Sequence, residues 1–323
     1  MAEIKTNILP NFLVIGAAKC GTTSIYHYLK QHHDVYMSPI KEPNHFSKDI
    51  NPEEFSPEYK HHEKMKNLNV SKYVRGDMKE DQWGAYVRSE EDYKLLFKFA
   101  EGKKRIGEIS NSYLYSNVAA ENIKSTLPGV KLIAILRNPV DRAYSHYLAN
   151  IRDGRAILPF RKELEQDLSK TNKGWGKSHL YIELGMYNEQ IKRFKKYFGP
   201  DQFKILLQDD LKANTPKVIK EVFEFLNLES EININFKEKH NEAKVPKNIK
   251  FIHFLTQIGL KRKIFRVLPN SIQPKVKALF FKKDGQEKMN LDDRKWLTSI
   301  FANEVEALSK ELDRDLSHWL VIK

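Results

Sequence analysis

The chain has 323 residues, of which 41% are hydrophobic and 11% aromatic, a composition typical of a globular rather than a disordered protein. Its single cysteine excludes a disulfide framework, and the 11 histidines lack the spacing of helical metal-binding motifs, so no metal site is expected. The net charge of +13 predicts an anionic partner, which the charge alone leaves open among nucleic acid, acidic lipid, acidic glycan and a phosphorylated ligand.

The N-terminal sequence, MAEIKTNILPNFLVIG, leads directly into an apolar segment. It has no basic region, hydrophobic stretch or cleavage site of the kind that signal peptides have. No stretch of the chain approaches the ~20 apolar residues of a membrane span. We therefore expect a cytoplasmic protein, a location that also agrees with the presence of one cysteine.

Apolar runs alternate with amphipathic stretches along the chain, which predicts a parallel sheet covered by helices. Strands are expected at 12–16, 34–37, 105–110, 131–136 and 203–208. Helices are expected at 22–31, 117–127, 139–151, 185–198, 215–228 and 291–312. The polar segment 47–90 has mixed signals and is expected to form loops and short helices.

The stretch GAAKCGTTS, residues 16–24, joins the first predicted strand to the first predicted helix. Gly16 and Gly21 have the spacing of a G-x-x-x-x-G-K-[ST] phosphate loop, but Thr22 stands in the lysine position and Lys19 lies between the glycines. A strand, a glycine turn and a helix N-terminus together form a cradle of backbone N–H groups for an anion. Without further motifs, an ordinary strand-to-helix turn would explain the pattern equally well.

Two further features narrow the range of ligands that this loop could bind. The lysine that serves the β- and γ-phosphates of a metal-bound triphosphate is missing after Gly21. The buried strand KLIAIL is followed by Arg137, where a Walker B strand would carry an acid. A site that lacks these metal-binding residues suits an adenosine phosphosulfate. Lysine and hydroxyl groups can stabilise the leaving group of such a ligand. The fold class that follows is α/β, a P-loop-like three-layer fold with a central parallel sheet flanked by helices.

Several motifs in order resemble those of sulfotransferases that use 3′-phosphoadenosine 5′-phosphosulfate (PAPS) and release 3′-phosphoadenosine 5′-phosphate (PAP). NFLVIGAAKCGTTSIYHYL resembles their 5′-phosphosulfate loop, and KLIAILRNPVDRAYSHYL resembles the motif that binds the 3′-phosphate. The segments GEISNSYLY, QDDL and DLSHWL also occur in the same order as similar segments of that family. The resemblance is to bacterial sulfotransferases and to the heparan sulfate N- and 3-O-sulfotransferase domains. It implies a single domain over 1–323, with a core at about 10–230 and a basic lid and helical C-terminal region at about 231–323.

The resemblance also implies which residues act in sulfuryl transfer. Lys19 would stabilise the charge that builds on the leaving 5′-phosphate oxygen. The segment SPIKEPNHFS, residues 38–47, resembles the K-E-P-x-F-F segment of glycan sulfotransferases, so Glu42 maps to the general base. Where relatives have a histidine after the proline, this chain has Asn44 and then His45, which makes His45 a candidate for a supporting catalytic role.

The cofactor would contact two further groups of residues. The loop residues implied for the 5′-phosphosulfate are Lys19, Cys20, Gly21, Thr22, Thr23 and Ser24. We interpret the Cys20 side chain as a small filler, because the reaction needs no thiol. Arg137 and Ser145 are implied for the 3′-phosphate, and Lys244 or Lys247 for a basic loop that closes over the cofactor. We interpret the nearby His146 as a packing residue on the same helix face as Arg142.

The acceptor is expected to be a hydroxyl or amine of a carbohydrate, since Glu42 lies in a K-E-P context, with contacts from about 47–90 and 150–185. Eleven Lys or Arg and no acids occur from Lys244 to Lys283. Within this stretch, 248–269 could contact an anionic membrane, line a cleft for an acidic or lipid-linked glycan, or pack as an ordinary amphipathic helix. A small-molecule kinase and a non-catalytic nucleic-acid-binding protein are the rival functions. The chain lacks a Walker lysine for the first and a recognition module for the second, so no nucleic-acid partner is expected.

Overall fold

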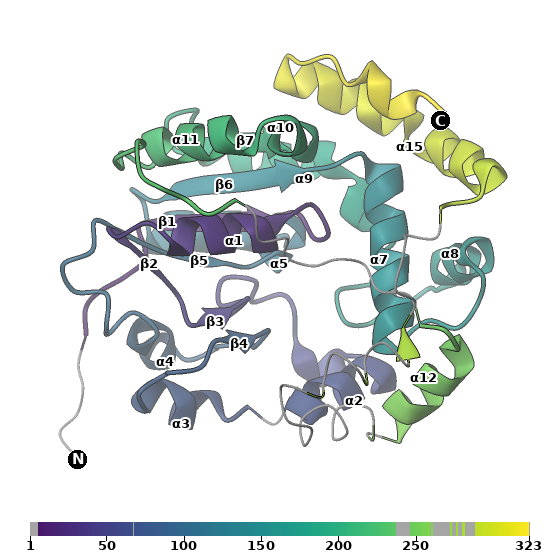
Figure 1. The fold of residues 1–323 in the computed structure, drawn as a ribbon, viewed down its shortest axis with the longest axis horizontal. Coiled ribbons are helices and arrows are strands. Elements are labelled where there is room, and N and C mark those ends of the chain that lie inside the picture. Colours follow the sequence, from purple (N-terminus) through teal and green to yellow (C-terminus); the bar gives the residue numbers. More distant parts are fainter. Residues whose placement is uncertain are drawn as a thin grey trace. The chain divides into compact units, whose positions relative to one another are not determined.

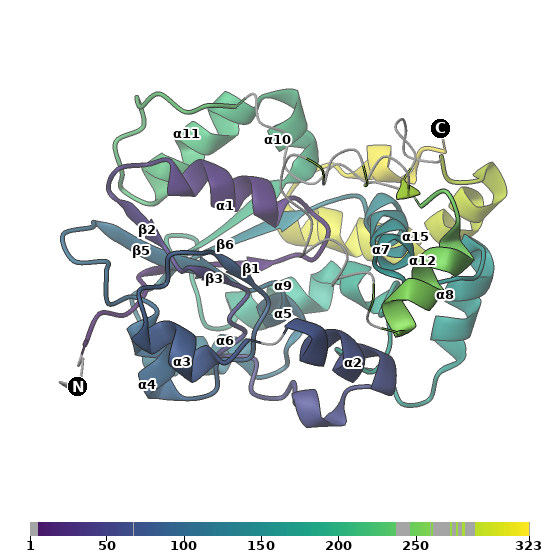
Figure 2. The same ribbon diagram turned by 60° about the horizontal axis from the view of Figure 1, so that its bottom comes forward.

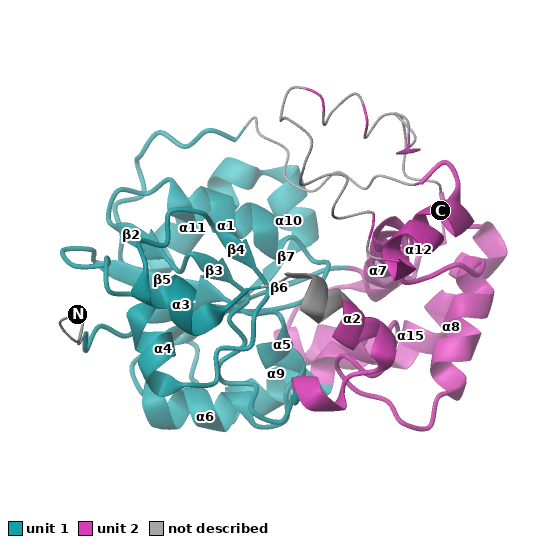
Figure 3. Ribbon diagram, turned by 90° about the horizontal axis from the view of Figure 1, so that it is seen from below, with its two compact units in different colours: residues 1–51, 68–137, 189–240 teal, residues 52–67, 138–188, 241–323 magenta. Residues whose placement is uncertain are grey.

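The computed structural model describes residues 6–66, 68–236, 246–258 and 288–322, together with 260, 272, 276, 280 and 281. The chain forms two compact units, each assembled from three separate stretches of sequence (Figure 3). The first unit contains residues 1–51, 68–137 and 189–240, and the second contains 52–67, 138–188 and 241–323. The expected core at 10–230 contributes to both units, and the organisation as a single domain stays a prediction.

A five-stranded parallel sheet lies at the centre of the first unit, in the order β2-β5-β1-β6-β7 (Figure 1). Its strands are β1 (Phe12–Gly16), β2 (Val35–Met37), β5 (Arg105–Ile109), β6 (Lys131–Leu136) and β7 (Phe203–Leu207). All residues of β1 and all but the first of β6 are buried, as their uninterrupted apolar sequences require in a sheet covered on both faces. The five predicted strands and their parallel arrangement are confirmed.

Helices cover both faces of this sheet (Figure 2). One face carries α1 (Thr22–Lys30), α10 (Gln208–Ala213) and α11 (Thr215–Phe225). The opposite face carries α5 (Ser112–Tyr115), α6 (Ala119–Thr126) and α9 (Tyr187–Lys195). This arrangement confirms the predicted three-layer α/β fold.

The segment 47–90 forms short elements, as expected, but also contributes a strand that the sequence did not reveal. Strand β3 (Ile40–Lys41) pairs in parallel with β4 (Gln82–Trp83), and Lys41 lies opposite Trp83 in this pair. The segment also contains η1 (Pro52–Glu54), α2 (Pro57–Lys66), α3 (Val70–Arg75) and the start of α4 (Glu90–Leu95). Strands of two residues are too short to show an alternating pattern, which explains why they were missed.

The described part of the second unit is helical, with α7 (Pro139–Asp153) packed against α12 (Ile249–Gln257), α15 (Leu291–Leu312) and η2 (Glu183–Gly185). It also contains α8 (Phe160–Ser169) and η3 (Ser317–Leu320). Helix α7 begins at Pro139, as the sequence predicts, and the Asn138 side chain accepts from the N–H of Val140. None of the described helices combines the length and the hydropathy that crossing a bilayer requires.

Only the first part of the basic stretch 248–269 lies in the described chain. In α12, Ile252 and Leu255 are buried and pack with Phe281, whereas Phe254 is 57% exposed. Phe251 is also exposed and stacks on Phe280. One side of the helix is therefore occupied by packing within the second unit, and a membrane contact through the exposed side stays a prediction.

The strand order places a topological switch point beside β1. The chain crosses from β1 to β2 on one side of the sheet and later returns to β6 and β7 on the other side, so β1 lies between β5 and β6. In open α/β sheets, ligands bind outside the carboxyl ends of the strands at such a point. The loop after β1 and the residue after β6 lie at this point.

Candidate active site

The loop after β1 has the backbone conformation of an anion cradle. Gly21 caps helix α1 with φ 110° and ψ 11°, a left-handed conformation that side chains rarely adopt. A Cβ at this position would meet its nearest neighbour, Gln208 Nε2, at an ordinary 3.5 Å, so the backbone angle and not the space selects glycine. Because glycine has no side chain, it provides no side-chain cap for the first-turn N–H groups. These groups and the helix dipole can then serve a bound anion.

The structure brings the Arg137 guanidinium group to the backbone of the loop that carries Lys19, the two residues predicted for opposite ends of the cofactor. Arg137 follows β6, and its Nη1 donates to the backbone oxygen of Lys19 at 3.3 Å, although the two residues are 118 positions apart. The N–H of Ala17 donates to Ile135 O at 2.9 Å and joins the loop to β6. Lys19 has a left-handed φ of 69°. The switch point thus carries a guanidinium group next to the lysine-bearing loop.

The remaining loop residues lie at the start of α1. Thr22 and Thr23 open the helix, Ser24 donates its N–H to Gly21 O at 3.0 Å, and Thr22 is buried. Cys20 is fully buried, and its Sγ donates to Ala18 O at 3.6 Å. A buried thiol in contact with a backbone carbonyl agrees with its interpretation as a small filler.

Glu42 lies at the same edge of the sheet. Its N–H donates to Ile109 O, at the end of β5, at 2.7 Å, and Ile109 pairs with Val14 of β1. Its φ of 67° is left-handed, which is strained for a glutamate and is found at functional sites. Lys41 Nζ at 3.0 Å and Asn111 Nδ2 at 2.8 Å both donate to Oε1. Among the described residues, Oε2 has no hydrogen-bond partner, and the side chain is 26% exposed.

Asn44 and His45 have different surroundings. The Asn44 amide donates to Glu42 O and to Ala85 O, both at 2.8 Å, and accepts from Ser112 Oγ at 2.6 Å. The His45 ring stacks on Tyr93 at 4.0 Å between centroids, and its Nδ1 lies 2.7 Å from Val87 O. Burial holds the pKa of His45 below its usual range. Asn44 therefore supports the backbone of the Glu42 turn, whereas the contacts of His45 are those of a packed aromatic cluster.

A buried carboxyl group beneath the Glu42 turn was missed by the sequence analysis. Glu108 in β5 is fully buried and accepts from Tyr113 Oη at 2.6 Å, Ser110 Oγ at 2.9 Å and Tyr93 Oη at 3.4 Å. Two of these hydroxyl groups in turn accept backbone N–H groups of the turn. Ser110 Oγ accepts from Asn44 at 3.0 Å, and Tyr113 Oη accepts from His45 at 3.0 Å.

This arrangement links Glu108 to the turn through two hydroxyl relays. Burial raises the pKa of Glu108 to about 7, against the opposing effect of the three hydroxyl donors, and the charge of Glu42 adds to the increase. The signal in the sequence was a lone acid inside the apolar strand RIGEIS, because a buried charge requires partners. Nothing in the pattern alone could identify those partners.

The other predicted residues lie in the second unit or outside the described chain. Ser145 lies on α7 and is partly exposed, so its role beside Arg137 stays a prediction. Arg142 is buried and donates to Tyr181 O, and its Nη1 lies 3.5 Å from His146 Nδ1, as the i,i+4 spacing predicts. Lys247 is exposed, and its N–H donates to Phe280 O at 2.8 Å. Lys244 lies outside the described residues.

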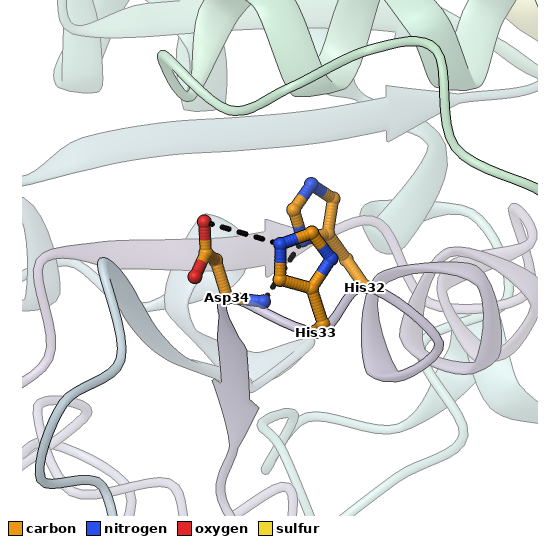
Figure 4. A group of neighbouring side chains, drawn as sticks. All are labelled: His32, His33 and Asp34. Carbon is orange, nitrogen blue, oxygen red and sulfur yellow. Dashed lines mark hydrogen bonds and ion pairs between the residues drawn. The ribbon is translucent and has the colours of Figure 1, made fainter.

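Within the described part of the chain, one group of side chains has ligand atoms close enough for a metal ion: His32, His33 and Asp34 (Figure 4). Both ring nitrogens of His32 are already used, since Nδ1 accepts from the N–H of Asp34 at 3.1 Å and Nε2 lies 3.0 Å from Glu229 O. Lys104 Nζ lies 2.6 Å from the Asp34 carboxylate and holds its pKa below the usual value. Protein contacts therefore account for this group without a metal ion.

The second unit contains a polar cavity of about 260 Å³. His179 is buried there, with its Nδ1 2.8 Å from Tyr59 Oη and its Nε2 3.4 Å from Glu163 Oε1. Asp167, also buried, accepts the backbone N–H of His179 at 2.7 Å. These contacts order the segment 155–179, which belongs to the stretch where acceptor contacts are expected. The cavity is lined by Glu58, Arg155, Ile157, Leu158, Glu163, Gln166, Asp167, Lys170 and His179.

Comparison with known proteins agrees with the geometry of the first unit. Residues 9–258 match the family described as the Sulfotransferase domain. The chain belongs to the sulfotransferase family. A solved sulfotransferase from Alicyclobacillus acidocaldarius superposes with a TM-score of 0.71 at 28% identity, over 97% of this chain and 99% of that structure.

The curated proteins that are similar to the present chain include carbohydrate-modifying enzymes. Carbohydrate sulfotransferase 15 of Mus musculus is 26% identical over 70% of this chain and 45% of its own length. Bifunctional heparan sulfate N-deacetylase/N-sulfotransferase 3 of Homo sapiens is 28% identical over 68% of this chain and 22% of its own length. The chain thus spans less than half the length of these two relatives.

Proposed function

We propose that this chain transfers a sulfuryl group from PAPS to a hydroxyl or amine group of a carbohydrate acceptor. Family membership supports the reaction class, and the names of the curated relatives support the acceptor class. The single observation that carries the proposal is the contact between Arg137 and the Lys19 loop at the switch point. This contact brings the Arg137 guanidinium group to the backbone of the loop that carries Lys19, which supports a ligand with two separate phosphate groups.

The residues at the switch point fit the donor. The first-turn N–H groups of α1, Thr22 and Thr23 would hold the 5′-phosphosulfate, because the glycine cap provides no competing side-chain acceptor. Arg137 would hold the 3′-phosphate with its planar guanidinium group, with Ser145 as a further donor. Lys247 and Lys244 remain candidates for closing over the bound donor.

In the transfer step, the acceptor oxygen or nitrogen forms a bond to sulfur while the bond between sulfur and the 5′-phosphate oxygen breaks. Glu42 takes the proton of the acceptor on Oε2, since Lys41 and Asn111 already donate to Oε1. The electron pair of the broken bond remains on the phosphate oxygen, where Lys19 stabilises it. His45 takes no part in this scheme, because its ring packs on Tyr93.

The replacement Glu42→Gln tests the scheme. The amide keeps the size of the side chain and loses the base, so we expect kcat to fall by about 10²- to 10⁴-fold while the affinity for PAP is retained. The assay follows PAP release from PAPS in the presence of an unsulfated glycan, and PAP affinity is measured by calorimetry. An unchanged kcat would exclude Glu42 as the base.

A further inference from the structure

Beside the proposed base lies an aromatic surface that the reaction scheme does not use. Trp83 is 48% exposed, and it is the one exposed tryptophan of the four, all of which belong to the described chain. Large exposed aromatic side chains are informative because burial is their usual state. This one ends β4, directly opposite Lys41 in the β3–β4 pair.

The ammonium group of Lys41 contacts both the Trp83 ring and the Glu42 carboxylate. Lys41 Nζ lies 3.0 Å from Glu42 Oε1 and 4.9 Å from the centroid of the Trp83 ring. Lys41 itself is buried, so this ammonium group is held between the two side chains. The backbone adds a second connection, because Gly84 donates its N–H to Lys41 O at 2.7 Å and Ala85 donates to Glu42 O at 2.9 Å.

The indole ring is also held from the side of α1. Tyr26 and His27 lie 6.5 and 6.4 Å from it between centroids, in tilted arrangements. Tyr26 Oη in turn lies 3.3 Å from Asp81 Oδ2, which forms an ion pair with Lys30. A ring fixed by neighbours on one side and exposed on the other loses little entropy when a ligand packs on it.

We propose that the exposed part of Trp83 is the platform on which a sugar ring of the acceptor packs, with the reacting group directed to Glu42. The C–H groups on one face of a pyranose carry partial positive charge, which the electron-rich face of an indole attracts. The inference rests on the proposed glycan sulfation, and it adds the subsite that holds the acceptor. It also places one acceptor contact in the stretch 47–90, where such contacts are expected from the sequence.

The test compares three variants with N-desulfated heparan and unsulfated chondroitin oligosaccharides as acceptors at saturating PAPS. Trp83→Ala should raise the acceptor KM roughly tenfold or more, because truncation of an aromatic anchor has effects of this size. Trp83→Phe should restore part of the loss, and the KM for PAPS should not change in either variant.

Phe99→Ala is the matched control. Phe99 is 54% exposed and has Lys98 Nζ 4.9 Å from its ring centroid, as Trp83 has Lys41. It comes before the N-terminal end of β5, however, whereas Glu42 contacts the C-terminal end of that strand. We expect its acceptor KM to equal that of the wild type. An unchanged acceptor KM in Trp83→Ala would overturn the inference while leaving the sulfotransferase activity in place.

A direct measurement of glycan binding tests the Trp83 platform independently of the proposed sulfation. Titration of the same oligosaccharides into the protein without PAPS, followed by calorimetry, should show binding that Trp83→Ala weakens. If the wild type binds PAP but neither binds nor sulfates any of these glycans, the platform is wrong. If glycans bind through Trp83 and PAP does not bind, the platform stands and the proposed donor is wrong.

Discussion

At the scale of single residues, the site depends on charges placed by backbone conformations that are unusual for their side chains. Lys19 and Glu42 both have a left-handed φ, at 69° and 67°, and each is held by contacts from a neighbouring strand end. Such strain persists only where the surroundings support it. Both residues were identified from motif resemblance, whereas their conformations were not visible in the sequence.

Removal of the Lys19 ammonium group should affect the transfer step more than binding. Lys19→Ala is expected to lower kcat by about 10²- to 10³-fold, the usual effect of losing one preorganised donor at a developing charge. The KM for the glycan should change little. Steady-state kinetics with varied PAPS and varied glycan measure both. A lower affinity with an unchanged kcat would assign Lys19 to binding alone.

Glu108 should leave a signature in the pH dependence of stability. Burial raises its pKa to about 7 in the folded protein, from 4.5 for an unperturbed glutamate. Between these values the folded protein binds more protons than the unfolded chain, so the Glu108 contribution to stability falls as pH rises through this window. One pKa unit corresponds to about 1.4 kcal/mol, so the contribution spans about 3 kcal/mol.

Glu108→Gln removes this titration. The free energy of unfolding of the variant, relative to that of the wild type, should therefore increase by about 3 kcal/mol between about pH 5 and pH 8. Urea denaturation across this range measures the change. Tyr93→Phe is the control, because it removes only the 3.4 Å contact and retains the carboxyl group. A difference that does not vary with pH would mean that Glu108 is ionised throughout.

At the scale of elements, the phosphate loop depends on one glycine. Gly21→Ala should destabilise the protein by about 1–2 kcal/mol, because the left-handed φ of 110° penalises any Cβ, and it should weaken PAP binding. Gly129→Ala is the control, since its Cβ would meet open space. Urea denaturation and PAP titration of both variants give the comparison. Equal stability of the two variants would contradict the role assigned to the Gly21 conformation.

The elements show what a sequence can predict and what it cannot. Long apolar strands such as β1 and β6 are buried on both faces, so their runs of hydrophobic residues indicated the central sheet. The β3–β4 pair has only two residues in each strand, and its pairing depends on contacts between distant segments. Trp83 could therefore not be placed beside Glu42 from the pattern alone. The same holds for the hydroxyl relays of Glu108, whose members were visible only as separate polar residues.

At the scale of the whole molecule, the net charge of +13 agrees with a polyanionic donor and with an acidic acceptor. The basic stretch from Lys244 to Lys283 lies mostly outside the described residues, so its use as a lid, a glycan cleft or a membrane contact stays a prediction. The charge by itself would serve a nucleic-acid-binding protein equally well. The contact of the Lys19 loop with Arg137 at the switch point is what favours a PAPS-dependent enzyme over a nucleic-acid-binding protein.

The most direct test of the account is the thermal stability of the protein with PAP, with Mg-ATP and without ligand. PAP at 100 times its Kd should stabilise the fold by ~2.7 kcal/mol. This stabilisation should be lost in Arg137→Ala and retained in Phe99→Ala, while Mg-ATP should have no comparable effect. Stabilisation by Mg-ATP and not by PAP would contradict the account and would favour a small-molecule kinase.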